Sequence, residues 1–383
     1  MTINPLEEHA RRYAKRAVLA DRRGDYEEAL KNYKRAVELF NKIISLYPDA
    51  PFTPLYRVLA EKYSKRIEVL EKQLSALPQG GRDTVPGDTH DFSILYPGER
   101  VNITFKDVVG LDHVKNLLKK IVIYPLRKPE LYPLGWPRGI LLFGPPGCGK
   151  TYITLALANE ANAVLISVTM ADIMSKWLGV AEKNVKRLFN TARDIALKGI
   201  PVIVFVDEVD GLLRSYSSEV GGEVRARNQF LIEMDGLISK SDEELPLFVI
   251  GATNKPWLLD PGFIRRFQKR VYIPPPDKAT RKKLFEYYIS KLMRVYKLDP
   301  SVDTEKLAEL TEGYSSFDIK QIVTEVQNNV AGEILEKAGT GETLAPRPIT
   351  MSDFVKVIQL VKPSIDRKQL AMIMEWSKAY MSI

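Results

Sequence analysis

The segment G-P-P-G-C-G-K-T at residues 144–151 constrains the fold most strongly, because it matches the phosphate-binding pattern G-x-x-x-x-G-K-[ST]. It follows an apolar run at residues 139–143 and precedes a helical stretch beginning at Tyr152, which is the strand–loop–helix context that the pattern requires. Backbone N–H groups of such a loop surround phosphate oxygens, and the helix N-terminus adds positive potential. The segment therefore predicts a nucleotide site in an α/β domain.

Short apolar strands alternate with helical stretches on both sides of this loop. Strands are predicted at residues 139–143, 164–168, 202–206, 247–251 and 271–273. Continuous apolar strands separated by helices are typical of a parallel sheet that is covered on both faces. We therefore expect a large α/β subdomain with a parallel five-stranded sheet at residues 97–272. Only helical periods follow, which predicts a small helical subdomain with a C-terminal helix at residues 273–383.

Residues 1–76 show three amphipathic helical periods separated by short turns, which predicts a small three-helix bundle. The first period ends near Gly24, and Asp25 is placed to cap the second helix. Between residues 78 and 91 the composition shifts to Pro, Gly, Asp and Thr without an apolar period. We therefore expect residues 77–96 to be a flexible linker.

Composition excludes several classes of site and protein. The single cysteine, Cys148, permits no internal disulfide, and the three histidines lie far apart, which argues against a zinc site. The net charge of +8 is compatible with nucleic-acid binding, but no dense basic run with interleaved aromatic residues is present, so we favour a solvated basic surface and expect no stable nucleic-acid partner. No apolar run is long enough to cross a bilayer and no secretory signal is visible, which favours a soluble, cytoplasmic protein.

An acidic pair, Asp207 and Glu208, directly follows the predicted strand at residues 202–206. Carboxylates at the carboxyl end of a buried parallel strand lie at the ligand crevice of such sheets. We expect Thr151 and Asp207 to hold Mg²⁺, and Lys150 to reach the β- and γ-phosphates of ATP. Glu208 is then placed to polarise the attacking water as general base.

Three further side chains complete the predicted catalytic set. Asn254 follows the strand at residues 247–251, where its amide can contact the γ-phosphate or the attacking water; capping of the turn before Pro256 is the plain structural alternative. Arg265 and Arg266 stand side by side before the last strand. An arginine finger from a neighbouring subunit accelerates phosphoryl transfer by roughly 10³–10⁵. Two solvated arginines are the common alternative.

The predicted nucleotide-binding residues are mainly the phosphate loop itself. They are Gly144, Pro145, Pro146, Gly147, Cys148, Gly149, Lys150, Thr151, Tyr152 and Gly110. The segment at residues 254–257 differs from the guanine-reading pattern N-K-x-D at its last position, so specificity for GTP is unsupported. ATP and Mg²⁺ are the expected cofactors.

These motifs, in this order, resemble the AAA ATPases, specifically the clade of microtubule-severing enzymes and of the vacuolar-sorting ATPase that dismantles ESCRT-III filaments. In M-S-K-W-L-G at residues 174–179, Lys176, Trp177 and Leu178 match the clade's first pore loop, which grips an extended polypeptide. Residues 215–227 resemble the second pore loop, and Arg265 and Arg266 fall on the finger positions. The resemblance implies a homo-oligomer of six subunits.

The N-terminal bundle is similar to MIT (microtubule interacting and transport) domains, on A-V at residues 17–18, G-D-Y-E-E-A at residues 24–29 and A-V at residues 36–37. Together the parts look most like the ESCRT-III-disassembling ATPase in its archaeal cell-division (Cdv) version. This resemblance implies that residues 1–76 bind tails of ESCRT-III-like filament subunits. The protein would then be recruited to filaments at membranes or at the division site, and it would contact the membrane only through the filament.

The chain departs from this family in three places. Residues 339–348 form only a short Gly/Pro-containing loop where eukaryotic members insert a β hairpin domain, so an activator that binds that domain is doubtful. Ser316 stands where the family usually has Gly, and Cys148 replaces the usual Thr. The alternatives are a microtubule-severing enzyme, a nucleic-acid helicase or loader, and an adaptor whose nucleotide site is only structural.

Overall fold

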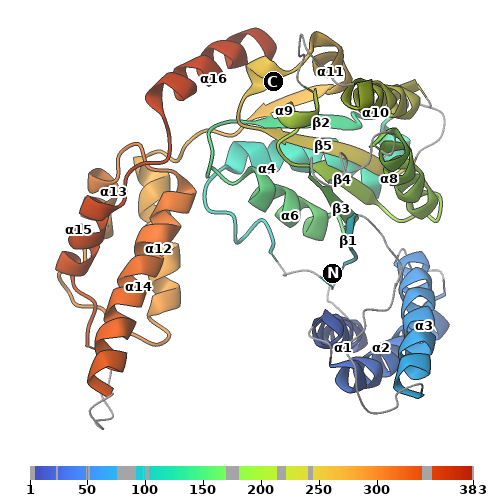
Figure 1. Ribbon diagram of the computed structural model, residues 1–383, viewed down its shortest axis with the longest axis horizontal. Coiled ribbons are helices and arrows are strands. Elements are labelled where there is room, and N and C mark those ends of the chain that lie inside the picture. The colour runs from blue at the N-terminus through green and yellow to red at the C-terminus, as the bar shows by residue number, and fades with distance from the viewer. Residues whose placement is uncertain are drawn as a thin grey trace.

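A six-stranded β-sheet with helices on both faces forms the centre of the computed structural model (Figure 1). A three-helix bundle lies beside the edge strand β1, and a separate helical lobe lies at the left of the same view. The structure describes residues 5–22, 25–48, 50, 52–75, 92–97, 99, 103–169, 181–213, 221–239, 245–338 and 347–381.

The sheet consists of β1 Ser93–Leu95, β2 Gly139–Phe143, β3 Val164–Val168, β4 Val202–Val206, β5 Leu247–Thr253 and β6 Lys269–Tyr272. The strand order is β1-β3-β4-β5-β2-β6, and every neighbouring pair is parallel except β1 with β3. The predicted α/β architecture is confirmed, but the predicted count of five strands is wrong. The extra strand β1 falls within residues 77–96, which the composition assigned to a linker, because three residues are too few to show an apolar period.

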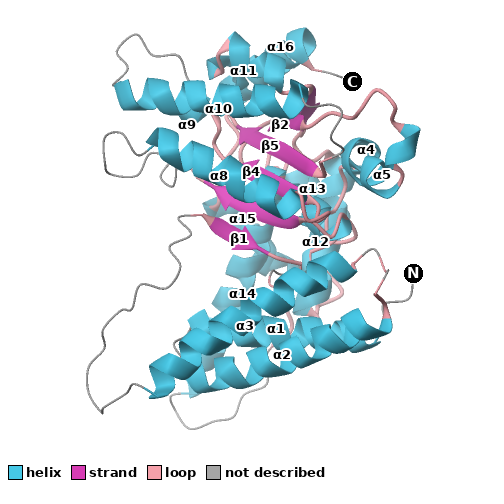
Figure 2. Ribbon diagram, turned by 90° about the vertical axis from the view of Figure 1, so that its right-hand side faces the viewer, coloured by secondary structure: helices cyan, strands magenta, loops and turns pink. Residues whose placement is uncertain are grey.

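Alternate residues of the central strands face two different helical layers. Leu141 and Phe143 of β2 belong to the apolar core that contains α8 (Ala181–Ala196) and α10 (Gly221–Ser239), which lie together on one face in Figure 2. Ile140 and Leu142 pack in the other core, with α4 (Asp112–Leu118) and α6 (Lys150–Glu160). This period of two explains why the strands read as continuous apolar runs, since both faces are covered.

Shorter elements connect these helices and strands. They are the π-helical η1 Lys119–Ile123, α5 Tyr124–Arg127, the 3-10 turns η2 Pro129–Leu131 and η3 Pro256–Leu258, α9 Asp210–Leu213 and α11 Pro261–Arg266. Of these, η3 and α11 follow β5 at its carboxyl end and carry the residues that come after Asn254.

The N-terminal bundle consists of α1 Pro5–Arg22, α2 Tyr26–Leu46 and α3 Thr53–Ser75. The Asp25 side chain accepts a hydrogen bond from the Glu28 N–H at 3.2 Å, so the predicted cap of α2 is confirmed. The Arg66 guanidinium of α3 donates to Asp21 of α1 at 2.8 Å, which joins the first and third helices. The bundle also contacts the sheet domain through Glu99, whose carboxylate accepts from the Tyr63 hydroxyl at 2.5 Å.

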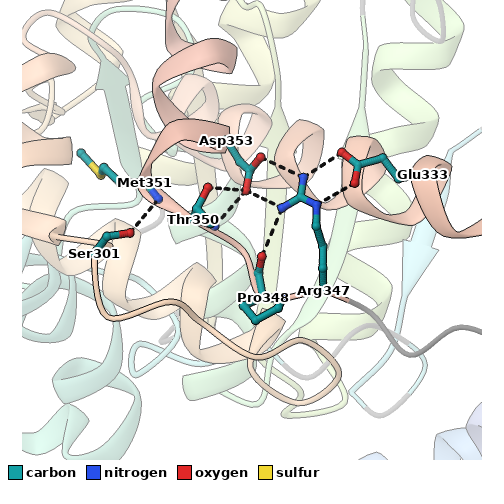
Figure 3. Close-up of polar contacts among 7 residues, drawn as sticks. All are labelled: Ser301, Glu333, Arg347, Pro348, Thr350, Met351 and Asp353. Atoms are coloured by element: carbon teal, nitrogen blue, oxygen red, sulfur yellow. Dashed lines mark hydrogen bonds and ion pairs between the residues drawn. The ribbon is translucent and has the colours of Figure 1, made fainter.

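The helical lobe consists of α12 Lys278–Leu292, α13 Thr304–Leu310, α14 Ser316–Ala338 and α15 Met351–Leu360. Arg347 fastens two of these helices, because its guanidinium pairs with Glu333 of α14 at 2.6 Å and with Asp353 of α15 at 2.8 Å (Figure 3). The ion pair with Arg347 and the hydrogen bonds from Thr350 hold the pKa of Asp353 at about 2. The Asp353 carboxylate therefore stays ionised at neutral pH, which keeps its ion pair with Arg347 formed.

The last helix, α16 (Arg367–Tyr380), leaves the lobe and returns to the sheet domain (Figure 1). Its Trp376 ring stands edge-on to Phe143, with ring centroids 4.8 Å apart. Ile373 and Trp376 are buried, whereas Tyr380 is 43% exposed. Among the residues that the structure describes, no helix combines the length and the apolar character that a membrane crossing requires.

Candidate active site

The phosphate loop connects the end of β2 to the start of α6, in the position that the motif predicts. Two of its glycines lie too close to neighbouring atoms to carry a side chain. A Cβ on Gly144 would stand 2.2 Å from the Ile273 carbonyl oxygen, and one on Gly147 would stand 2.5 Å from the Ser315 hydroxyl. Gly147 also has a left-handed φ of 71°. The loop is therefore pressed between the sheet and the helical lobe, and it requires glycine at both positions.

Lys150 is the first residue of α6 and its ammonium group is fixed inside the loop. Its Nζ donates to the carbonyl oxygens of Gly144 at 2.9 Å and Pro145 at 2.8 Å, and to Asn254 Oδ1 at 2.6 Å. The residue is 8% exposed, and this burial lowers the pKa of Lys150 to about 8. The arrangement holds a cation where phosphate oxygens of a bound nucleotide would lie.

The carboxyl end of β4 brings two acids to the same place. The Thr151 hydroxyl donates to Asp207 Oδ2 at 2.8 Å, so the two predicted Mg²⁺ ligands are neighbours. Glu208 follows with a φ of 50°, a left-handed backbone that is unusual for a residue other than glycine. Strain of this kind is concentrated at functional sites, where the surrounding structure holds it. The turn exposes the Glu208 carboxylate at the cavity described next.

A cavity of about 380 Å³ opens beside these groups, between the sheet domain and the helical lobe. The predicted residues that line it are Pro146, Gly147, Cys148, Gly149, Lys150, Thr151, Tyr152, Asp207, Glu208 and Asn254. Gly144 and Pro145 lie behind it and supply carbonyl oxygens to Lys150. Gly110 is flanked by two lining residues, Val109 and Leu111.

The other side of this cavity was not predicted from the sequence. Asp107 lines it from the segment before α4, while Leu284 and Tyr288 of α12 and Phe317 and Lys320 of α14 line it from the lobe. The Phe317 N–H donates to the Gly147 carbonyl at 3.0 Å, which joins α14 to the phosphate loop. Helical periods were visible within residues 273–383, but they gave no indication of which helical face meets the loop.

Cys148 belongs to the phosphate loop, and its side chain is buried. Its thiol is 2% exposed and donates to the Pro146 carbonyl, with 3.6 Å between Sγ and O. Burial raises the pKa of Cys148 to about 12, so the group stays a neutral thiol at physiological pH. A thiol that is both buried and protonated is a poor nucleophile and a poor target for oxidation.

The two arginines lie on α11, away from the residues that line the cavity. Arg266 donates to both carboxylate oxygens of Asp235, at 2.8 and 2.6 Å, and to the Gly262 carbonyl at 2.8 Å. Arg265 is exposed at the surface. The structure therefore does not bring either arginine to the site of its own chain, and it distinguishes a fixed Arg266 from an exposed Arg265.

The C-terminal helix supports the site from behind. Gln369 of α16 donates from Nε2 to the Asn254 carbonyl oxygen at 3.1 Å, while Asn254 Oδ1 accepts from Lys150. Trp376 packs on Phe143, the residue that precedes the phosphate loop. The predicted pore residues Lys176, Trp177 and Leu178, and residues 215–220 of the second predicted pore loop, lie outside the described residues.

Comparisons with known proteins agree with this arrangement. Three family models match: the ATPase family associated with various cellular activities (AAA) at residues 140–275, the MIT domain at residues 8–72, and the Vps4 C terminal oligomerisation domain at residues 331–380. Cell division protein C of Sulfolobus acidocaldarius is 47% identical over 99% of this chain and 98% of its own length.

Human vacuolar protein sorting-associated protein 4A is 44% identical over 59% of this chain, and the match spans 50% of that protein. Among solved structures, the FIGL-1 AAA domain in complex with ADP is similar with a TM-score of 0.65 and 32% identity, over 77% of this chain and 95% of that one. A katanin structure is similar with a TM-score of 0.62 and 31% identity, over 77% and 99% of the two chains.

Proposed function

Because this chain belongs to the Vps4-like AAA ATPases, which carry an MIT domain and a Vps4 C-terminal oligomerisation domain and hydrolyse ATP, we propose that it disassembles ESCRT-III-like filaments during cell division. The single observation that carries the proposal is the 47% identity to cell division protein C over the whole chain, bundle and C-terminal helix included. The filament subunits would be captured by the bundle and released from the polymer by ATP-driven force.

Hydrolysis in this proposal uses the groups that line the cavity. Glu208 accepts a proton from a water molecule as the water oxygen attacks the γ-phosphorus, and the bond between that phosphorus and the β–γ bridging oxygen breaks to leave ADP and phosphate. Lys150 stabilises the negative charge on the β- and γ-phosphates, and the Asn254 amide orients the water. The hydroxyl of Thr151 and the carboxylate of Asp207, 2.8 Å apart, are oxygen donors that suit Mg²⁺ and would hold it. When bound, Mg²⁺ neutralises charge on the phosphate oxygens.

Assembly into a ring would complete the site. Arg265 is exposed and lies outside the cavity of its own chain, as an arginine finger for a neighbouring subunit must. Arg266, fixed by Asp235, would hold the finger's helix in position. A hexamer is the assembly that the family implies. The turnover per subunit should then rise with protein concentration, and a constant turnover down to the monomer would contradict shared sites.

Force would reach the filament subunit through the pore. We assign this grip to Lys176, Trp177 and Leu178, because they match the clade's first pore loop and the indole of a tryptophan offers an apolar surface that accepts many sequences. The bundle would hold the tail of the same subunit near the pore. Recruitment would place the protein in the cytoplasm at membranes or at the division site, with the filament as the only link to the membrane.

Sedimentation of filaments tests the proposal. Polymers of an ESCRT-III-like protein from the same cells should move from pellet to supernatant when the wild-type chain and ATP are added. Glu208→Gln should bind ATP and the filament, lower turnover by about 10²- to 10⁴-fold, and leave the polymer in the pellet. Glu325→Gln, on the exposed surface of α14, is the control that should behave as wild type. ATP hydrolysis by the wild type without filament loss would contradict the proposal, and DNA- or microtubule-stimulated turnover would redirect it.

A further inference from the structure

One tyrosine hydroxyl connects three elements at the mouth of the nucleotide cavity. Tyr287 of α12 donates to Asp107 Oδ1 at 3.4 Å and accepts from the Lys291 ammonium at 2.7 Å. The Tyr152 hydroxyl, on the first turn of α6, lies near enough to interact with the Tyr287 hydroxyl. Asp107 and Tyr152 belong to the sheet domain, whereas Tyr287 and Lys291 belong to the helical lobe. The Tyr287 hydroxyl is therefore a polar link between the two subdomains.

The partners of this hydroxyl on the sheet domain are themselves fixed. Asp107 Oδ2 accepts from the Thr104 N–H at 2.9 Å and from the Thr104 hydroxyl at 3.0 Å. These hydrogen bonds lower the pKa of Asp107, so the carboxylate is ionised and its bond from Tyr287 is charge-assisted. Tyr152 directly follows Thr151 of the phosphate loop. The link therefore ends on the part of the molecule that binds phosphate.

On the lobe side, Tyr287 is connected to the cavity through Tyr288, the next residue along the chain. The ring of Tyr288 stands edge-on to the ring of Tyr287, with centroids 5.2 Å apart, and Tyr288 lines the cavity. Lys291 lies 4.1 Å from the centre of the Tyr287 ring, which adds a cation–π contact. Holding the Tyr287 hydroxyl thus holds Tyr288 against the nucleotide space.

We propose that Tyr287 is a positioning residue that keeps the helical lobe closed over bound nucleotide and thereby sets the rate at which ADP leaves. A hydroxyl link suits this role because it breaks and reforms as a unit, while the apolar cores of the two subdomains stay intact on either side. The inference rests on the nucleotide site alone and not on the filament proposal, so purified protein without filaments tests it.

The test is Tyr287→Phe in the full chain, which keeps the ring and its contact with Tyr288 and removes only the hydroxyl. We expect the dissociation rate of a fluorescent ADP analogue, followed by stopped flow, to rise about 5- to 20-fold, the loss typical of one hydrogen bond to a charged group. Single-turnover hydrolysis at saturating ATP should change less than about twofold, because Tyr287 does not touch the reacting atoms. An unchanged ADP dissociation rate, or an equal fall in single-turnover hydrolysis, would overturn the proposal.

Two further variants separate this role from a general loss of stability. Tyr296→Phe removes a tyrosine hydroxyl from the same lobe, where the residue packs against the lobe core, and should leave ADP dissociation at the wild-type rate. Tyr152→Phe should raise the ADP dissociation rate. In the double variant with Tyr287→Phe, the fold-increase in this rate should be smaller than the product of the two single fold-increases. An effect equal to that product would overturn the link between the two hydroxyls.

Discussion

The two walls of the nucleotide cavity are held by different kinds of contact. The phosphate wall, formed by residues 144–151 with Asp207, Glu208 and Asn254, is backed by strands buried on both faces. Its Lys150 is 8% exposed and donates to three oxygens. The lobe wall, formed by Leu284, Tyr288, Phe317 and Lys320, is more open, and Phe317 is 58% exposed.

The difference separates two tasks that a cyclic motor must perform. Transition-state stabilisation requires charges that do not reorganise during the reaction, and a buried, fully bonded lysine meets that requirement. Release of product requires a wall that moves. A lobe that is joined to the sheet domain through side-chain and backbone hydrogen bonds meets this second requirement. Substitutions in the phosphate wall should therefore lower ATP turnover strongly, whereas substitutions in the lobe wall should alter it by small factors.

The largest difference between the two walls should come from replacing, one at a time, the two lysines that line the cavity. Lys150→Ala removes a preorganised cation from the phosphate wall, and turnover should fall by about 10²- to 10³-fold. Lys320→Ala removes an exposed lysine from the lobe wall, and turnover should fall less than about fivefold. Steady-state phosphate release measures both. Similar losses for the two variants would break the distinction between the walls.

A smaller effect should appear with pH. Because burial lowers the pKa of Lys150 to about 8, the free protein loses this proton as the pH rises through 8, well before an ordinary lysine would. ATP binding then requires proton uptake, so affinity should fall by up to about tenfold for each pH unit above 8. Titration calorimetry at pH 8.5, in two buffers with different ionisation enthalpies, measures the proton directly.

The Tyr287→Phe variant supplies the control for this pH dependence. The pKa of Tyr287 is raised by burial, so its hydroxyl keeps its proton over the same pH range. The Tyr287→Phe variant should therefore bind ATP more weakly at every pH, but its ATP affinity should fall with pH at the same slope as that of the wild type. An ATP affinity that does not change between pH 7.5 and 9.5 would contradict the assignment to Lys150.

The smallest effect should come from Arg347, which fastens α14 to α15 far from the cavity. Arg347→Ala should lower the free energy of unfolding by about 1–2 kcal/mol, discounted because the arginine side chain is 38% exposed. Thermal melting measures the loss, and ADP affinity should stay unchanged. Arg12→Ala, which breaks an exposed pair with Glu8 at 3.4 Å, should leave the melting temperature at the wild-type value.

Sequence patterns predicted the phosphate wall far better than the lobe wall. The strands and the loop follow one another along the chain, so their apolar runs and glycine spacing were visible locally. The position of the lobe wall depends on contacts between distant residues, such as Tyr287 with Asp107 across 180 positions. The support of Asn254 by Gln369, across 115 positions, is equally distant along the chain. No local period encodes which faces meet at such distances, and the three-residue β1 was missed because it is too short to show one.

The return of α16 to the sheet also has a consequence for synthesis. The phosphate loop leaves the ribosome early, whereas the helix that covers Phe143 and bonds to Asn254 is made from residues 367–380. At about 5–20 residues per second, the nascent chain spends on the order of 10–40 s with this part of the sheet uncovered. Nucleotide turnover should therefore begin only after translation of α16, which keeps an unfinished motor from consuming ATP.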